Sequence, residues 1–106
     1  MLLRIHHAAI ICADYVKSKH FYTEILGLAT IAEHYRAQRA SYKLDLALPD
    51  GSQIELFSFV EPPPRPSYPE VRGLRHLAFA VHDVAQCKAQ LESRGVAVES
   101  VRVDEY

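Results

Sequence analysis

The feature that most constrains the fold of this chain is a segment that occurs twice. Residues 6–28 (HHAAIICADYVKSKHFYTEILGL) can be laid over residues 75–96 (RHLAFAVHDVAQCKAQLESRGV). His7 then falls on His76, at an offset of 69 residues. A period of this size that is present twice indicates a paired supersecondary unit rather than a solenoid.

Each copy has the pattern of a strand followed by a helix. Asp14 and Asp83 stand at the same offset and suit helix N-caps, where a carboxylate accepts hydrogen bonds from free backbone N–H groups. Apolar residues then recur at helical spacing. Gly27 and Gly95 end these stretches and suit the left-handed conformation that often follows a helix.

The two strands that open the copies carry small side chains on the same face as the histidines. By alternation, His7 shares a face with Ala9, and His76 shares a face with Ala78. The bulkier residues occupy the opposite face, which we expect to pack under the helix. The histidine face should therefore be open and concave. The same alternation predicts that His6 points away from His7.

The residues after Gly27 complete the first module. Alternating apolar residues predict three further strands, at about 28–36, 41–48 and 52–59. Pro49-Asp50-Gly51 predicts the turn between the last two. The first module is therefore βαβββ. The stretch EPPPRPSYP (61–69) favours extended polyproline geometry, and its position indicates a linker more than a ligand for a proline-binding domain.

The second copy has fewer residues after its helix than the first. In the first copy, 32 residues (28–59) lie between Gly27 and the end of the module. After Gly95 the sequence has 11 residues, which is enough for one strand at 96–103. We therefore expect an α+β fold of paired βαβββ modules, the second truncated at its C-terminal end. The expected organisation is one domain over residues 1–106, with module one at about 1–60, the linker at 61–69 and a partial module two at 70–106.

The composition excludes several classes of protein. Hydrophobic residues make up 49% and charged residues 24%, as in ordinary soluble domains. A formal charge of −1 provides no electrostatic footprint for nucleic acid. No apolar run approaches the roughly 20 residues of a membrane span. The two cysteines suggest neither a disulfide scaffold nor a metal pair. We expect a cytoplasmic protein without nucleic-acid or membrane partners.

Three side chains suggest a metal site. A lone histidine that opens a strand is more often a surface residue, but the symmetric placement of His7 and His76 favours a shared site. Glu55 lies between apolar neighbours in SQIELFSF (52–59), where a carboxylate is costly unless it is paired or metal-bound. The alternative is that Glu55 faces solvent. Two imidazoles and one carboxylate leave coordination positions open, as in catalytic metal sites.

The motifs HxxIxCxD…SxxFYxxxLG (7–27), IEL (54–56) and HLAFAVxD (76–83) resemble those of the vicinal oxygen chelate superfamily, which includes glyoxalase I and bleomycin resistance proteins. Three longer stretches look like a YaeR-like subgroup of lactoylglutathione-lyase-like proteins: YRAQRASYKLDLAL (35–48), IELFSF (54–59) and PPPRPSYPEVRGLRHLAF (62–79). The resemblance implies paired modules curling round one divalent metal ion (Ni, Zn, Mn or Fe), with His7, Glu55 and His76 as ligands. The family's fourth ligand, a glutamate on the last strand of module two, has no counterpart here.

The resemblance also implies an activity. It indicates a metal-dependent glyoxalase-type lyase or isomerase, acting on an oxygen-chelating substrate such as the hemithioacetal of glutathione and methylglyoxal. Glu55 is the candidate base. A homodimer is expected, and the histidines could meet within one chain or between chains. Arg36, Arg39 and Lys43 are candidates for binding an anionic substrate, although a solvated strand face also explains them.

Two other functions remain open at this point. An extradiol-type dioxygenase would use a two-histidine, one-carboxylate iron site in which Glu55 is idle. A non-catalytic small-molecule binding (resistance) protein of the same fold would need no metal. The presence of His7 and His76 argues against the non-catalytic binding protein, because binding proteins of this fold generally lack the metal histidines.

Overall fold

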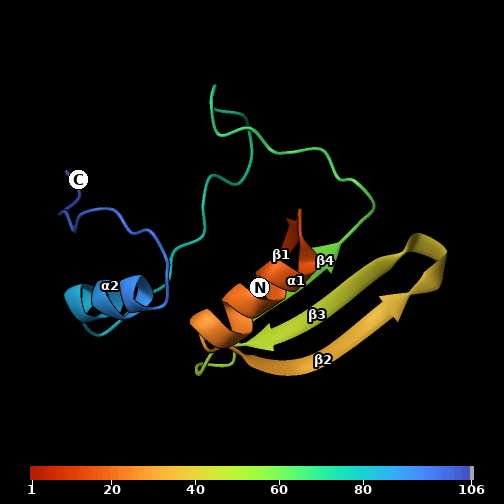
Figure 1. The fold of residues 1–106 in the computed structure, drawn as a ribbon, viewed down its shortest axis with the longest axis horizontal. Coiled ribbons are helices and arrows are strands. Elements are labelled where there is room, and N and C mark those ends of the chain that lie inside the picture. The colour runs from red at the N-terminus through yellow and green to blue at the C-terminus, as the bar shows by residue number, and fades with distance from the viewer. Residues whose placement is uncertain (106) are drawn as a thin grey trace. The chain divides into compact units, whose positions relative to one another are not determined.

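The computed structural model of the chain describes residues 1–105. The chain divides into two compact units, Met1–Arg65 and a second that begins at Pro66. The first unit contains a four-stranded sheet and the second contains one helix (Figure 1). In the described part of the chain, no helix is both long and apolar enough to cross a membrane.

The first unit is a βαβββ module, as the sequence predicts. Its elements are β1 (His7–Cys12), α1 (Tyr15–His20), the π-helical turn η1 (Phe21–Ile25), β2 (Ala29–Arg36), the short 3₁₀ turn η2 (Ala37–Arg39), β3 (Ser41–Ala47) and β4 (Gln53–Ser58). The strand order is β1-β4-β3-β2. β1 runs parallel to β4, and the other neighbours are antiparallel. The three predicted strands after the helix are confirmed.

Local signals in the sequence account for the ends of these elements. The Asp14 side chain accepts a hydrogen bond from the backbone N–H of Lys17 at 3.1 Å, and so caps the start of α1. Gly27 has a φ of 75°, which glycine adopts without steric cost. Between β3 and β4, Asp50 accepts hydrogen bonds from both the backbone N–H and the hydroxyl of Ser52. The predicted turn is therefore present.

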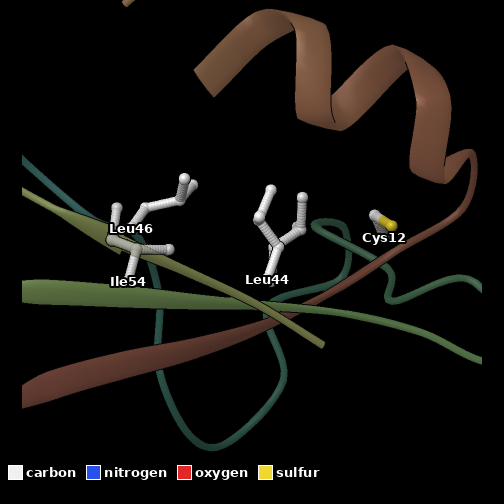
Figure 2. Packing of buried hydrophobic residues seen from close by; sticks show 5 residues of the cluster. Cys12, Leu44, Leu46 and Ile54 are labelled. Atoms are coloured by element: carbon white, nitrogen blue, oxygen red, sulfur yellow. The ribbon is translucent and has the colours of Figure 1, made fainter. Parts of the chain in front are cut away.

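The core of the first unit lies between the sheet and its helix. Leu44, Leu46, Ile54 and Leu56 are 0–2% exposed, and Cys12 joins them at the end of β1. Figure 2 shows the side chains of this core on the helix side of the strands. Full burial of such a side chain contributes about 1.5–3 kcal/mol, so this cluster is what holds α1 on one face of the sheet. The polar residues that alternate with these core residues along the strands lie on the opposite face of the sheet.

The second unit contains α2 (Val84–Ser93), capped by the Asp83 side chain, which accepts from the backbone N–H of Gln86 at 3.0 Å. The helix prediction is confirmed. The strands predicted at 76–81 and 96–103 are wrong, because no residue of this unit up to 105 is in a strand. A strand is stable only when another strand satisfies its backbone groups, and none in the described part of this unit does so. Phe79 and Val81 accordingly remain 42% and 46% exposed.

Candidate functional site

His7 and Glu55 meet on the face of the sheet that α1 does not cover. β1 and β4 are parallel neighbours, and the residue paired with Glu55 is Ala9. His7 lies two positions earlier, on the same face as Ala9. Its Nε2 atom is 2.9 Å from Oε2 of Glu55. The structure thus brings together two of the three predicted metal ligands.

The Glu55 carboxylate is largely withdrawn from water. Its side chain is 18% exposed, against 42% for His7. A carboxylate in such a place needs hydrogen-bonding or charged partners to offset its lost hydration. It has two, since Lys43 Nζ lies 2.8 Å from Oε1 while His7 faces Oε2. Glu55 is therefore an engaged side chain and not one that merely faces solvent.

Lys43 joins Glu55 to a second carboxylate. On the antiparallel β3–β4 pair, Asp45 lies directly opposite Glu55, an arrangement of like charges that is unfavourable by itself. Lys43 Nζ lies 2.7 Å from Oδ1 of Asp45 and contacts both carboxylates, and so its ammonium offsets the repulsion between them. Hydrogen bonds to Asp45 and then to Glu55 raise the pKa of Lys43 above its usual value. Lys43 is among the residues predicted from the sequence, whereas Asp45 is not, although strand alternation places it on the same face.

His6 lies beside His7, contrary to the expectation from strand alternation. The two Nδ1 atoms are 2.9 Å apart, so that one imidazole donates and the other accepts. The expectation is wrong because β1 begins at His7 and alternation does not govern the residue before a strand. His6 occupies the side of the His7 ring away from Glu55, where it can fix which nitrogen of His7 carries the proton.

The two arginines proposed for anion binding lie where β2 ends and η2 follows. Arg36 is the last residue of β2, and Arg39 belongs to η2. The Arg39 guanidinium lies 5.0 Å from the centroid of the Phe59 ring, within the range of a cation–π contact. Phe59 in turn stacks on Phe57, with 6.1 Å between ring centroids. An aromatic pair with a cation over one of its rings therefore lies at the end of β4.

A second polar cluster lies on the helix-covered face and is unrelated to the candidate site. Tyr15 donates its hydroxyl proton to Glu33, and Lys19 Nζ lies 2.7 Å from the same carboxylate oxygen. The hydrogen bond from Lys19, and then that from Tyr15, lower the pKa of Glu33. Burial, followed by the contact with Glu33, raises the pKa of Tyr15. This cluster ties α1 to β2, and it offers a matched control for the ion pair at Glu55.

His76 belongs to the second unit, in the stretch where a strand was predicted, and its side chain is exposed. The predicted three-ligand set draws on both units, so His76 remains a prediction. Among residues 1–105, no group of three or more His, Cys, Asp or Glu side chains is already arranged to hold a metal ion.

The donor pair in the first unit suits a divalent cation. An imidazole nitrogen and a carboxylate oxygen are the mixed ligands that zinc, nickel, manganese and iron accept. Donors that each lie about 2.1 Å from one cation are roughly 3.0–3.4 Å from each other in octahedral or tetrahedral geometry. The separation of 2.9 Å between His7 Nε2 and Glu55 Oε2 is close to that range. The residues present therefore fit such an ion.

Comparison with known proteins points to one family. A model of the Glyoxalase/Bleomycin resistance protein/Dioxygenase superfamily matches residues 4–106. The uncharacterized protein YaeR of Escherichia coli (strain K12) is 54% identical over 105 residues, which are 99% of this chain and 81% of that protein. The uncharacterized protein YwkD of Bacillus subtilis (strain 168) is 52% identical, and 98% of this chain and 82% of that protein are covered. The crystal structure of SMU.1112c has a TM-score of 0.94 at 42% identity, covering 100% of this chain and 85% of that one.

More distant structures share the fold alone. Leishmania major glyoxalase I has a TM-score of 0.73 at 23% identity, covering 96% of this chain and 73% of that one. A mutant of the fosfomycin resistance protein FosX from Listeria monocytogenes, complexed with Mn(II) and 1S,2S-dihydroxypropylphosphonic acid, has a TM-score of 0.72 at 18% identity. That alignment covers 99% of this chain and 79% of FosX.

Proposed function

Because the chain belongs to the glyoxalase/bleomycin resistance protein/dioxygenase superfamily, we propose that it is a metal-dependent glyoxalase-type lyase or isomerase. Its substrate would be a small molecule with two adjacent oxygens, such as the hemithioacetal of glutathione and methylglyoxal. The observation that carries the proposal is the contact of 2.9 Å between His7 Nε2 and Glu55 Oε2 on the open face of the sheet.

The proposed ligands are His7, Glu55 and His76, and the ion would be nickel, zinc, manganese or iron. The contact between the first two supports their assignment, whereas His76 is supported by its equivalent place in the repeat. The complex of FosX with Mn(II) supports a divalent ion in this fold. Such an ion, when bound, supplies Lewis-acid stabilisation of the negative charge that develops on the substrate oxygens.

The proposed chemistry is an internal proton transfer. Glu55 would take the proton from the substrate carbon that bears the hydroxyl and the sulfur, and a proton would return to the neighbouring carbonyl carbon. The product is the thioester of a hydroxy acid, with the same atoms as the substrate, so no oxidant is consumed. Glu55 is the candidate base because its carboxylate lies on the open face of the sheet, beside the proposed ligand His7.

We also propose residues that bind an anionic substrate. Arg36 and Arg39 remain candidates for contacting a carboxylate such as those of glutathione. Lys43 is already engaged by two carboxylates, which makes it the weakest of the three candidates. We also propose a homodimer, which sedimentation of the purified chain would test.

A comparison of two carboxylate variants tests the activity. The chain is stripped of metal, reloaded with nickel or zinc, and assayed for thioester formation from the hemithioacetal. Glu55→Gln should lower the metal-dependent rate by about 10²–10⁴-fold, the usual contribution of a general base. Glu33→Gln, which also removes a lysine-paired carboxylate but on the helix-covered face, should leave the rate unchanged.

Other outcomes would replace the proposal. Iron-dependent oxygen uptake with a catechol that persists in Glu55→Gln would assign the chain to the extradiol-type dioxygenases. A chain that binds no stoichiometric metal would be a small-molecule binding protein instead.

A further inference from the structure

Lys43 is held between two carboxylates on the open face of the sheet. Its ammonium lies 2.7 Å from Oδ1 of Asp45 and 2.8 Å from Oε1 of Glu55. The three side chains are 27%, 16% and 18% exposed, so water competes only weakly for these contacts. Asp45 and Lys43 stand two residues apart on β3, and the pairing of β3 with β4 places Glu55 opposite Asp45.

We propose that Lys43 is a positioning residue for Glu55. It holds Oε1, so that Oε2 alone faces His7 and is presented to a cation. This inference rests on the proposed metal site and adds to it the group that sets the orientation of the carboxylate ligand.

The Glu55 carboxylate has two equivalent oxygens. Unrestrained, the Glu55 side chain can rotate about its terminal bond and present either oxygen or both. With Oε1 bound to Lys43 and Oε2 2.9 Å from His7 Nε2, each oxygen has a separate partner and the rotation is restricted. Partners that orient a metal ligand in this way generally affect metal affinity strongly.

Asp45 explains why the lysine stays in place. A lysine side chain has four rotatable bonds and seldom holds one position without an anchor. Asp45 supplies that anchor from the same strand, at 2.7 Å. Two of the three ammonium protons are thereby used by Asp45 and Glu55, which is more than a lysine that only attracts a substrate anion would require.

The sign of the effect separates positioning from simple electrostatics. An ammonium close to a bound cation repels it, so that removal of the charge alone would tighten metal binding. A positioning role predicts the opposite, because the loss of Lys43 frees the Glu55 carboxylate to rotate away from the orientation in which Oε2 faces His7.

Titration with Co²⁺ tests the inference on the full chain, with visible absorption of the bound ion as a second readout. Lys43→Met should weaken Co²⁺ binding by about 10–100-fold and change the absorption of the bound ion. Lys43→Arg should bind more tightly than Lys43→Met. Lys19→Met, which removes an ion pair of the same 2.7 Å length from the helix-covered face, should match the wild type.

Thermal unfolding without metal verifies that each variant is folded, and Lys43→Gln provides a second route if Lys43→Met does not fold. Lys43→Gln also removes the ammonium that holds Oε1 and should weaken Co²⁺ binding several-fold, whereas loss of the positive charge alone would tighten it. Folded variants that bind Co²⁺ as tightly as the wild type, or more tightly, would overturn the inference and leave the proposed function intact. If the wild type binds no Co²⁺, or if Glu55→Gln binds it equally well, both the positioning role of Lys43 and the proposed function are contradicted.

Discussion

His7 and Glu55 make contact across β1 and β4 although they are not partners in the parallel ladder, where Glu55 is paired with Ala9. The contact runs diagonally along one face of the sheet. Ala9, which is paired with Glu55 in the ladder, carries only a methyl group, and we expect this small side chain to leave room for the imidazole and the carboxylate.

Enlarging Ala9 should separate the two proposed ligands. Ala9→Leu places a branched side chain next to the contact, and we expect it to weaken binding of Zn²⁺ by at least about tenfold. Isothermal titration would measure the change. Ala29→Leu, at the exposed start of β2, is the control and should bind as the wild type does. Unchanged affinity in Ala9→Leu would show that the space beside His7 is not needed.

Removing the imidazole of His7 should remove a ligand. His7→Gln keeps a polar side chain at the start of β1, and the expected loss of Zn²⁺ affinity is more than about 100-fold, larger than the loss of an outer partner. His20→Gln, at the exposed end of α1, should change nothing. Competition with a chromophoric chelator gives both values. Equal affinities in the two variants would exclude His7 from the site.

Stability should depend on the core under α1 and not on the edge of the sheet. Leu44 is 0% exposed, and Leu44→Ala should lower the free energy of unfolding by about 2–5 kcal/mol. Ile31 is 52% exposed, and Ile31→Ala should cost less than about 1 kcal/mol. Urea denaturation of both variants measures the difference. Similar losses would contradict the assignment of the core.

The Glu33 cluster should make part of the stability depend on pH. Its hydrogen bonds with Lys19 and Tyr15 hold the pKa of Glu33 below the ordinary value of 4.5. The stabilisation is therefore complete above that value and is lost as the pH falls through the lower pKa of the folded state. Because the pair is partly exposed, we expect less than about 1 kcal/mol.

The difference in unfolding free energy between the wild type and Glu33→Gln, measured by urea denaturation from about pH 7 to pH 3, isolates this part. The difference should shrink as the solution becomes acidic. A difference that stays constant over this range would show that the charge of Glu33 contributes nothing.

Much of the first unit can be predicted from the sequence because its signals are local. The alternation in residues 7–12 and 53–58 is enough to place His7 and Glu55 on the face opposite the core. Asp14 and Gly27 mark the ends of the helical segment, because a cap and a left-handed residue act within one turn.

The predictions that are wrong or incomplete concern features that depend on residues outside the local segment of sequence. The segments 76–81 and 96–103 have the composition of strands, but a strand also requires a neighbour, and the described part of their unit contains none. Asp45 was overlooked because its importance comes from the pairing of β3 with β4, which sequence periodicity does not specify. His6 was misjudged because alternation was extended one residue beyond the start of β1.

The proposed metal site requires that His7, Glu55 and His76 bind one cation. X-ray absorption at the zinc edge of the Zn²⁺-loaded chain tests this directly, since it reports the number of imidazole and oxygen neighbours of the metal. We predict two imidazoles in the wild type, one in His7→Gln and in His76→Gln, and one oxygen fewer in Glu55→Gln. An unchanged zinc environment in any one of these three variants would contradict the proposed ligand set.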